Sequence, residues 1–464
     1  MNETVHKRII IALVAAALFM EMLDGSIINT ALPHIAQSFG EEPITLRFAV
    51  TSYFLCLAIF IPICGWMADR FGTQKIFCMS IGLFILSSLF CGLSNDLISL
   101  TLFRGIQGFS GALMTPVARM IMVRQFPPQE LVKVTTYVFL PVLIGPLLGP
   151  VVGGFFATYY SWRMVFFVNI PIGIVLLLCA RKFVKNDIAE QKQKLDILGF
   201  FLVGVGLCLT SLGFECLTSD FISRTNVFII LGSGLLLLLA FFFYSSKKKE
   251  NAVLDMTLFR VRTFNFGILG SISVTLVVGG GAFLMPLLFQ LQFGMTPFRS
   301  GLFLVPFACG ALLSRFFVGR LLKRMGVKNT LILGVLGNGL SYCAMGFVSL
   351  QTPEYLILLN MFLMGVFSII LFATNGPLVY SDIPRNKKTQ ATALDATLRQ
   401  FTMSMAIGTS ALLLIFYSHN IGTKIHIEGA IQAFHYAFFT LVLFFILQIV
   451  ICFKMNNDDG KSLL

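Results

Sequence analysis

The chain has 464 residues, of which 57% are hydrophobic and only 12% are charged, and its mean hydropathy is +0.87. Soluble proteins carry about a quarter charged residues, so this composition excludes a water-soluble enzyme. The formal charge of +13 would suit a nucleic-acid-binding protein, but the basic residues lie in short clusters between long apolar runs.

Those apolar runs predict an all-α membrane protein. A transmembrane helix needs about 20 mostly apolar residues, whereas strands of a membrane barrel would alternate in polarity over about ten residues. Fourteen runs meet the requirement for a helix: 9–29, 47–68, 76–94, 98–119, 134–157, 164–180, 196–216, 225–244, 264–288, 299–318, 329–349, 354–378, 393–417 and 433–453.

The placement of the basic residues predicts the orientation in the bilayer. If the N-terminus is cytoplasmic, the inner segments hold 26 of the 34 Lys and Arg residues and the outer loops hold five. This asymmetry follows the positive-inside rule and places both termini in the cytoplasm. The charge is therefore a topology signal, and we expect no nucleic-acid partner.

The order of the runs predicts two six-helix bundles, 1–195 and 263–464, separated by an inserted transmembrane hairpin and loop, 196–262. A repeated motif, G-x-x-x-[DK]-R-x-G, supports the division, because Gly65 to Gly72 closes the second run and Gly319 to Gly326 closes the tenth. Two such bundles around a central path form a transporter architecture.

Few ionisable residues lie within the runs, and each is costly in a bilayer. Glu21 and Asp24 are three residues apart and so share a helix face, and Arg104 lies in the fourth run. At 1.5 Å per residue, all three lie roughly 8 to 12 Å from the outer ends of their helices. An acid and base pair at this depth could bind and release a proton, or could be a permanent salt bridge between two helices.

A second charged pair is predicted at the inner ends of the second and fourth runs. Asp69, with Arg70 beside it, would meet Arg119 there, and Gly65 and Gly72 would allow a tight turn between the second and third runs. This pair is either a conformational latch or a solvated surface bridge worth little energy.

The fifth run contains an unusual density of glycine and proline. Glycines four residues apart allow close contact between helices, and prolines weaken the hydrogen-bond ladder of a helix, so we expect a bent and closely packed helix. The residues concerned are Gly145, Pro146, Gly149, Pro150, Gly153 and Gly154.

The ten cysteines have neither metal-ligand nor disulfide spacing, and we expect no cofactor, with protons as the coupling ion.

Together these motifs resemble the fourteen-helix drug:proton antiporters of the major facilitator superfamily, the EmrB/QacA type, over the whole chain. Gly65 to Gly72 resembles the loop 2-3 motif, and Gly145 to Gly154 matches G-x-x-x-G-P-x-x-G-G. Arg104 to Gly108 is similar to the span-four motif R-x-x-Q-G, and Leu23 to Pro33 is similar to the span-one signature. Asn169 to Gly173 resembles the span-six pattern of that branch.

The resemblance implies a proton-coupled exporter of amphipathic organic compounds in the cytoplasmic membrane, and no enzyme. It also implies that Asn29 and Gln107, each within one of these motifs, face the substrate cavity. We expect a monomer in the lipid bilayer, with an adaptor protein as a candidate partner. A proton-coupled importer of a small organic solute and a non-transporting membrane sensor of the same fold remain alternatives.

The charge asymmetry gives a direct test of topology. We expect a cysteine placed at Lys248, within the cluster Lys247 to Lys249, to react with a membrane-impermeant maleimide only from the cytoplasmic side, because the cluster belongs to the inner segments. Labelling in intact and permeabilised cells measures this. Labelling of that cysteine from outside intact cells would contradict the fourteen-span topology.

Overall fold

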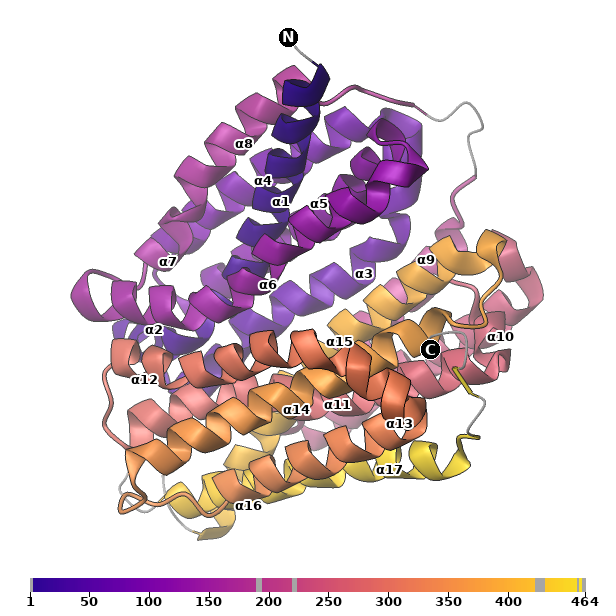
Figure 1. Cartoon of the computed structure of the whole chain (residues 1–464). Helices are drawn as coiled ribbons and strands as arrows, with labels where there is room; N and C mark the ends of the chain where they lie inside the picture. Colours follow the sequence, from indigo (N-terminus) through magenta and orange to yellow (C-terminus); the bar gives the residue numbers. More distant parts are fainter. Residues whose placement is uncertain (1–2, 189–193, 219–222, 422–429, 457–458, 461–464) are drawn as a thin grey trace. The chain divides into compact units, whose positions relative to one another are not determined.

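The computed structural model describes residues 3–188, 194–218, 223–421, 430–456 and 459–460, and these residues form an all-helical fold (Figure 1). The chain divides into two compact units. Unit 1 comprises Met1–Phe200 and Thr296–Gly301, and unit 2 comprises Phe201–Met295 and Leu302–Leu464.

Unit 1 contains the first eight helices and two short 3-10 turns. They are α1 Glu3–Ile27, η1 Ile28–Thr30, α2 Leu32–Phe39, η2 Pro43–Leu46, α3 Arg47–Phe71, α4 Thr73–Leu93, α5 Leu97–Gln125, α6 Pro128–Tyr159, α7 Met164–Phe167 and α8 Asn169–Phe183.

The remaining helices belong to unit 2, apart from the first residues of α9 and of α12. They are α9 Ile197–Glu215, α10 Arg224–Lys248, α11 Arg262–Leu287, α12 Pro297–Phe303, α13 Val305–Met345, α14 Glu354–Tyr380, α15 Lys388–Ile421, α16 Ile431–Leu443 and α17 Phe445–Lys454. The short turns between them are η3 Cys216–Thr218, η4 Lys249–Asn251, η5 Met256–Arg260, the π-helical η6 Leu288–Gln292 and η7 Arg385–Lys387.

The predicted fourteen spans are confirmed. Twelve segments of the described chain are long and apolar enough to cross a bilayer. One of them, Pro297–Met345, holds two spans, because its helix α13 is broken at Gly326, and the fifth predicted span lies in α6, whose apolar part Ile144–Tyr159 is shorter. The chain is thus a multi-pass membrane protein.

The two units pair their helices in the same way. In unit 1, α1 packs on α6, α3 on α5, and α4 on α8; in unit 2, α11 packs on α15, and the first part of α13 on α14. The first, second, fourth and fifth helices of each six-helix set therefore have equivalent partners, as expected of a repeated unit.

The repeated motif ends both second helices in the same backbone conformation. Gly72 has φ +97° and Gly326 has φ +77°, a region that side chains other than glycine rarely adopt. The expectation for Gly65 was wrong, since α3 continues as a helix to Phe71 and Gly65 lies inside it. Only the last glycine of each motif makes the turn.

Glycines on one face of α6 hold α1 at close range. Cβ atoms added at Gly145 and Gly153 would overlap the α1 residues Met22 and Ile27, and for Gly153 the obstacle is a backbone carbonyl oxygen. The Thr30 hydroxyl adds a hydrogen bond to the Pro150 carbonyl, at 3.1 Å. Small residues thus let the two backbones approach, as in other membrane helix pairs.

The α9–α10 hairpin is fastened to its following loop. The Ser245 hydroxyl of α10 donates to the Leu254 carbonyl at 2.6 Å and accepts from the Met256 amide at 3.0 Å. In the same loop the carboxylate of Asp255, which is wholly buried, pairs with Lys387 at 3.2 Å. The hairpin is thereby tied to the loop that precedes α15.

The contact of α6 with α1 predicts the effect of a single methyl group. We expect Gly153→Ala to lower the thermal midpoint of the purified protein, because overpacking against backbone costs about 1–3 kcal/mol and the gain from replacing a helical glycine is only about 0.5–1 kcal/mol. Gly232→Ala is the matched control, since a Cβ there meets open space. An equal or higher midpoint for Gly153→Ala would contradict the close packing.

Candidate functional site

Asp24 and Arg104 form an ion pair inside unit 1. The Asp24 Oδ2 atom lies 2.6 Å from Nη1 of Arg104, and both side chains are wholly buried. The sequence prediction that these two residues lie at the same depth, one on α1 and one on α5, therefore holds in the structure. Removal of two charges from water costs several kcal/mol for each ion, so the pair needs further hydrogen bonds.

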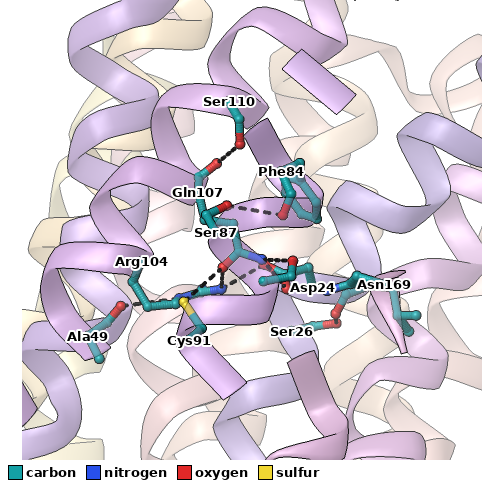
Figure 2. Close-up of polar contacts among 12 residues, drawn as sticks. Asp24, Ser26, Ala49, Phe84, Ser87, Cys91, Arg104, Gln107, Ser110 and Asn169 are labelled. Atoms are coloured by element: carbon teal, nitrogen blue, oxygen red, sulfur yellow. Dashed lines mark hydrogen bonds and ion pairs between the residues drawn. The ribbon is translucent and has the colours of Figure 1, made fainter. Parts of the chain in front are cut away.

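Neutral amides from two other positions supply those bonds, as Figure 2 shows. Gln107 Nε2 and Asn169 Nδ2 both donate to Asp24 Oδ1, at 2.9 and 2.8 Å. The Gln107 carbonyl oxygen accepts from Arg104 Nη1 at 2.8 Å. Both carboxylate oxygens of Asp24 are thus bound, by residues of α5 and α8.

The guanidinium of Arg104 is held on its other sides as well. Its Nε donates to the Ala49 carbonyl at 3.4 Å, and its central carbon lies 4.3 Å from the centre of the Tyr53 ring. Both contacts come from α3, and the second is a cation–π interaction. Its Nη2 has no hydrogen-bond partner among the described residues.

Gln107 lies elsewhere than expected. It does not face a cavity, because its side chain is wholly buried and also donates to Ser88 at 2.8 Å. The physical reason is its position three residues after Arg104 on the same helix face. Asn29 lies in η1 and is also nearly buried. The sequence analysis did not predict that Asn169 binds a buried charge, although a single amide beside an apolar run could have indicated such a role.

Glu21 belongs to a separate contact. Its carboxylate accepts a hydrogen bond from the Thr115 hydroxyl of α5 and is almost fully buried. Arg119, one turn further along α5, adds an electrostatic attraction. The two acids of α1 therefore face α5 side by side but have different partners, because α5 presents Arg104, Gln107, Thr115 and Arg119 along one side.

The charged pair at the end of α3 has a different basic partner from the predicted one. Asp69 Oδ1 lies 2.6 Å from Nη2 of Arg124, so the prediction of Arg119 was wrong. Helix α5 continues to Gln125, six residues beyond the predicted end of the span, which is about 9 Å. Arg124 thus reaches the level of Asp69, and Arg70 is exposed beside it.

The same arginine joins the segment that follows α8. Arg124 Nη1 donates to the Asp187 carbonyl at 3.0 Å, and this carbonyl also accepts from the Thr73 amide at 3.2 Å. Asn186 Oδ1 accepts from the Lys75 amide at 3.3 Å. Because the N-cap residue Gly72 has no side chain, the first turn of α4 is capped by residues 186–187 instead.

The comparisons with known proteins identify the family. The model of the Major Facilitator Superfamily matches residues 14–409. The chain belongs to the major facilitator superfamily. It is 36% identical to "Probable transport protein HsrA" of Haemophilus influenzae over 97% of this chain and 96% of that one. It is 32% identical to "Putative multidrug resistance protein MdtD" of Escherichia coli, over 97% and 95%.

Solved structures agree on the fold. An auto-inhibited peptide transporter of the POT family has a TM-score of 0.72 at 14% identity and covers 96% of this chain and 97% of its own. A bacterial homologue of the human lysosomal transporter Spinster has a TM-score of 0.67 at 15% identity, over 100% and 98%. The family model and the full-length relatives show that the chain is a membrane transporter of this superfamily and not an enzyme, and they confirm the resemblance found in its motifs.

The cap on α4 gives a prediction for Arg124. We expect Arg124→Gln to increase hydrogen exchange of the α4 amides from Thr73 to Ile76, by up to about fivefold, because a partly exposed ion pair contributes up to about 1 kcal/mol. Hydrogen–deuterium exchange with mass spectrometry measures this.

Asp69→Asn should give a smaller increase, because it removes the ion pair but leaves the Arg124 bond to the Asp187 carbonyl, and the double variant should not exceed Arg124→Gln by much, because the Asp69 contact is already lost in that variant. Arg119→Gln is the matched control and should leave these amides unchanged. Equal exchange in the Arg119 and Arg124 variants would refute the assignment.

Proposed function

We propose that this transporter is a proton-coupled antiporter that exports amphipathic organic compounds across the cytoplasmic membrane by alternating access. The observation that carries the proposal is the buried Asp24–Arg104 pair, because a titratable carboxylate inside a membrane helix bundle marks a functional site by default. The full-length similarity to a relative named as a multidrug resistance protein supports the drug-like substrate class.

Protonation of Asp24 would act directly on this network. The neutral acid loses the charge-assisted bond to Arg104, which is roughly twice as strong as a neutral hydrogen bond. Arg104 would then keep Gln107, the Ala49 carbonyl and the Tyr53 ring as partners. Contacts between α1 and α5 would therefore weaken when the proton binds, and this change can bias one conformation of the transporter over another.

The other site residues have proposed roles around this centre. Glu21 would modulate the proton site from its own contact with Thr115, and Asp69 with Arg124 would form a latch that favours one conformation. The α6 glycines would hold α1 in register. In energy, one proton moved through 100 mV supplies about 2.3 kcal/mol, which supports a roughly fortyfold substrate gradient.

We further propose that both termini are cytoplasmic and that the transporter is a monomer, with an adaptor protein as a candidate partner. The proposed domains are two bundles, 1–195 and 263–464, and an inserted hairpin, 196–262. The charge asymmetry of the loops supports the orientation, and the shared helix pairing of the two units supports the repeat.

The decisive measurement is proton release from the purified protein when a candidate substrate is added in weakly buffered solution. We expect Asp24→Asn to reduce this release to background, because an amide cannot titrate. Arg104→Lys should also impair it, since lysine keeps the charge but lacks the planar guanidinium. Glu21→Gln should have a smaller effect, because Glu21 lies outside the Asp24 network.

Asp395→Asn is the matched control. Asp395 is also a nearly buried helical acid and is paired with Arg399 at 2.9 Å, but it lies in unit 2 outside the proposed site, so its variant should release protons as the wild type does. Undiminished release from an Asp24→Asn, Glu21→Gln double variant would overturn the proposal and make the Arg104 pair structural.

A further inference from the structure

A groove runs between α4 and α8, and none of its lining residues takes part in the Asp24 network. It has a volume of about 620 Å³, within the range of small-molecule sites. Its lining changes character along its length. Lys75 and Arg181 line one end, and the rest includes Met79, Gly82 and Leu86.

The two basic side chains lie at adjacent helix ends. Lys75 is in the first turn of α4, and Arg181 is in the last turn of α8. The amide of Gln74 fixes these ends together, because its Nε2 donates to the Arg181 carbonyl at 2.9 Å. This bond holds together the two helix ends from which the cations extend.

Neither cation is neutralised within the described part of the chain. Both side chains are exposed, and no described acidic residue forms an ion pair with them. Lys75 is also at the positive end of the α4 dipole, where a basic residue is unfavourable. This end of the groove therefore presents two exposed cations that form no ion pair within the described part of the chain.

The rest of the groove is suited to hydrocarbon. From Gln74 to Leu86 it follows twelve residues of α4, which is about 18 Å at 1.5 Å per residue, close to the half-thickness of about 15 Å of a bilayer core. Met79 and Leu86 are 43% and 52% exposed, as expected of side chains that contact acyl chains in a membrane protein.

Gly82 keeps the middle of the groove open. A Cβ added there would meet no atom within 4 Å. Glycine in a helix interior lowers helix stability by about 0.5–1 kcal/mol relative to alanine, so the open space at Gly82 reduces the stability of α4. A chain-like ligand could pass this point, whereas a larger residue would block it.

We propose that this groove binds an anionic phospholipid, with its phosphate between Lys75 and Arg181 and one acyl chain along Met79 and Gly82 to Leu86. In the orientation proposed above, the lipid belongs to the cytoplasmic leaflet. Basic pockets between membrane helices on that side bind anionic headgroups in other proteins. The length of the apolar part favours a lipid over free phosphate. This inference is independent of proton coupling and of the transported substrate.

Native mass spectrometry of the full-length protein in detergent tests the proposal. Delipidated protein is titrated with phosphatidylglycerol, with phosphatidylethanolamine of the same acyl chains, and with inorganic phosphate. We expect one phosphatidylglycerol to bind more tightly than phosphatidylethanolamine, and inorganic phosphate at millimolar concentration to leave it bound.

Two kinds of variant separate the charge from the shape of the groove. Lys75→Gln with Arg181→Gln should weaken phosphatidylglycerol binding about 30-fold, which corresponds to about 2 kcal/mol for two basic residues. Gly82→Leu should fill the groove and weaken binding with the charges intact. It should also fold, because leucine is a better helix former than glycine.

The matched controls lie outside the groove. Arg8→Gln with Lys247→Gln removes two other exposed cations, and Gly232→Leu adds a side chain where a Cβ also meets open space; both should retain wild-type affinity. Wild-type affinity in the Lys75, Arg181 variant or in Gly82→Leu would overturn the proposal. Equal binding of the two lipids, or displacement by inorganic phosphate, would overturn it as well.

Discussion

The central constraint on unit 1 is that a carboxylate and a guanidinium, both closed off from solvent, must satisfy each other and their remaining hydrogen-bonding atoms. Asp24 alone draws side chains from α5 and α8, and Arg104 adds contacts from α3. Four helices must therefore keep their positions to within hydrogen-bond tolerance. The glycine face of α6 serves the same requirement, since it fixes the distance of α1.

The two units share a pairing scheme but differ in the chemistry of their buried contacts. In unit 2, α13 and α14 are joined by a bond from Asn338 to Ser368, and α14 and α17 by reciprocal bonds between Asn375 and Gln448. These groups are neutral and cannot change charge. Unit 2 also contains ion pairs, Asp255–Lys387 and Asp395–Arg399, but in each of them the basic side chain is partly exposed, whereas both side chains of the Asp24–Arg104 pair in unit 1 are wholly buried.

Features that depend on a single length, either the rise per residue of a helix or the length of an apolar run, could be predicted from the sequence. Rise per residue placed Asp24 and Arg104 at one depth, and apolar length gave the spans. Contacts that depend on where a helix ends, or on the direction of a side chain, could not be predicted. Asp69 pairs with Arg124 and not with Arg119, because helix α5 continues beyond its apolar part. The Gln107 side chain points to the Asp24–Arg104 pair, and the hydrophobic periodicity of the sequence does not predict that direction. Asn169 joins that pair through a fold contact 145 residues away in the chain.

The cap on α4 has a consequence for biogenesis. Asn186, which binds the Lys75 amide, follows it by 111 residues. At a synthesis rate of about 5–20 residues per second, the ribosome needs roughly 6 to 22 s to reach the capping residues. During that interval the first turn of α4 lacks these capping bonds. The cap on the third spanning helix of unit 1, α4, therefore forms only after the sixth, α8, has been synthesised, so the order of synthesis separates a helix from the residues that complete its end.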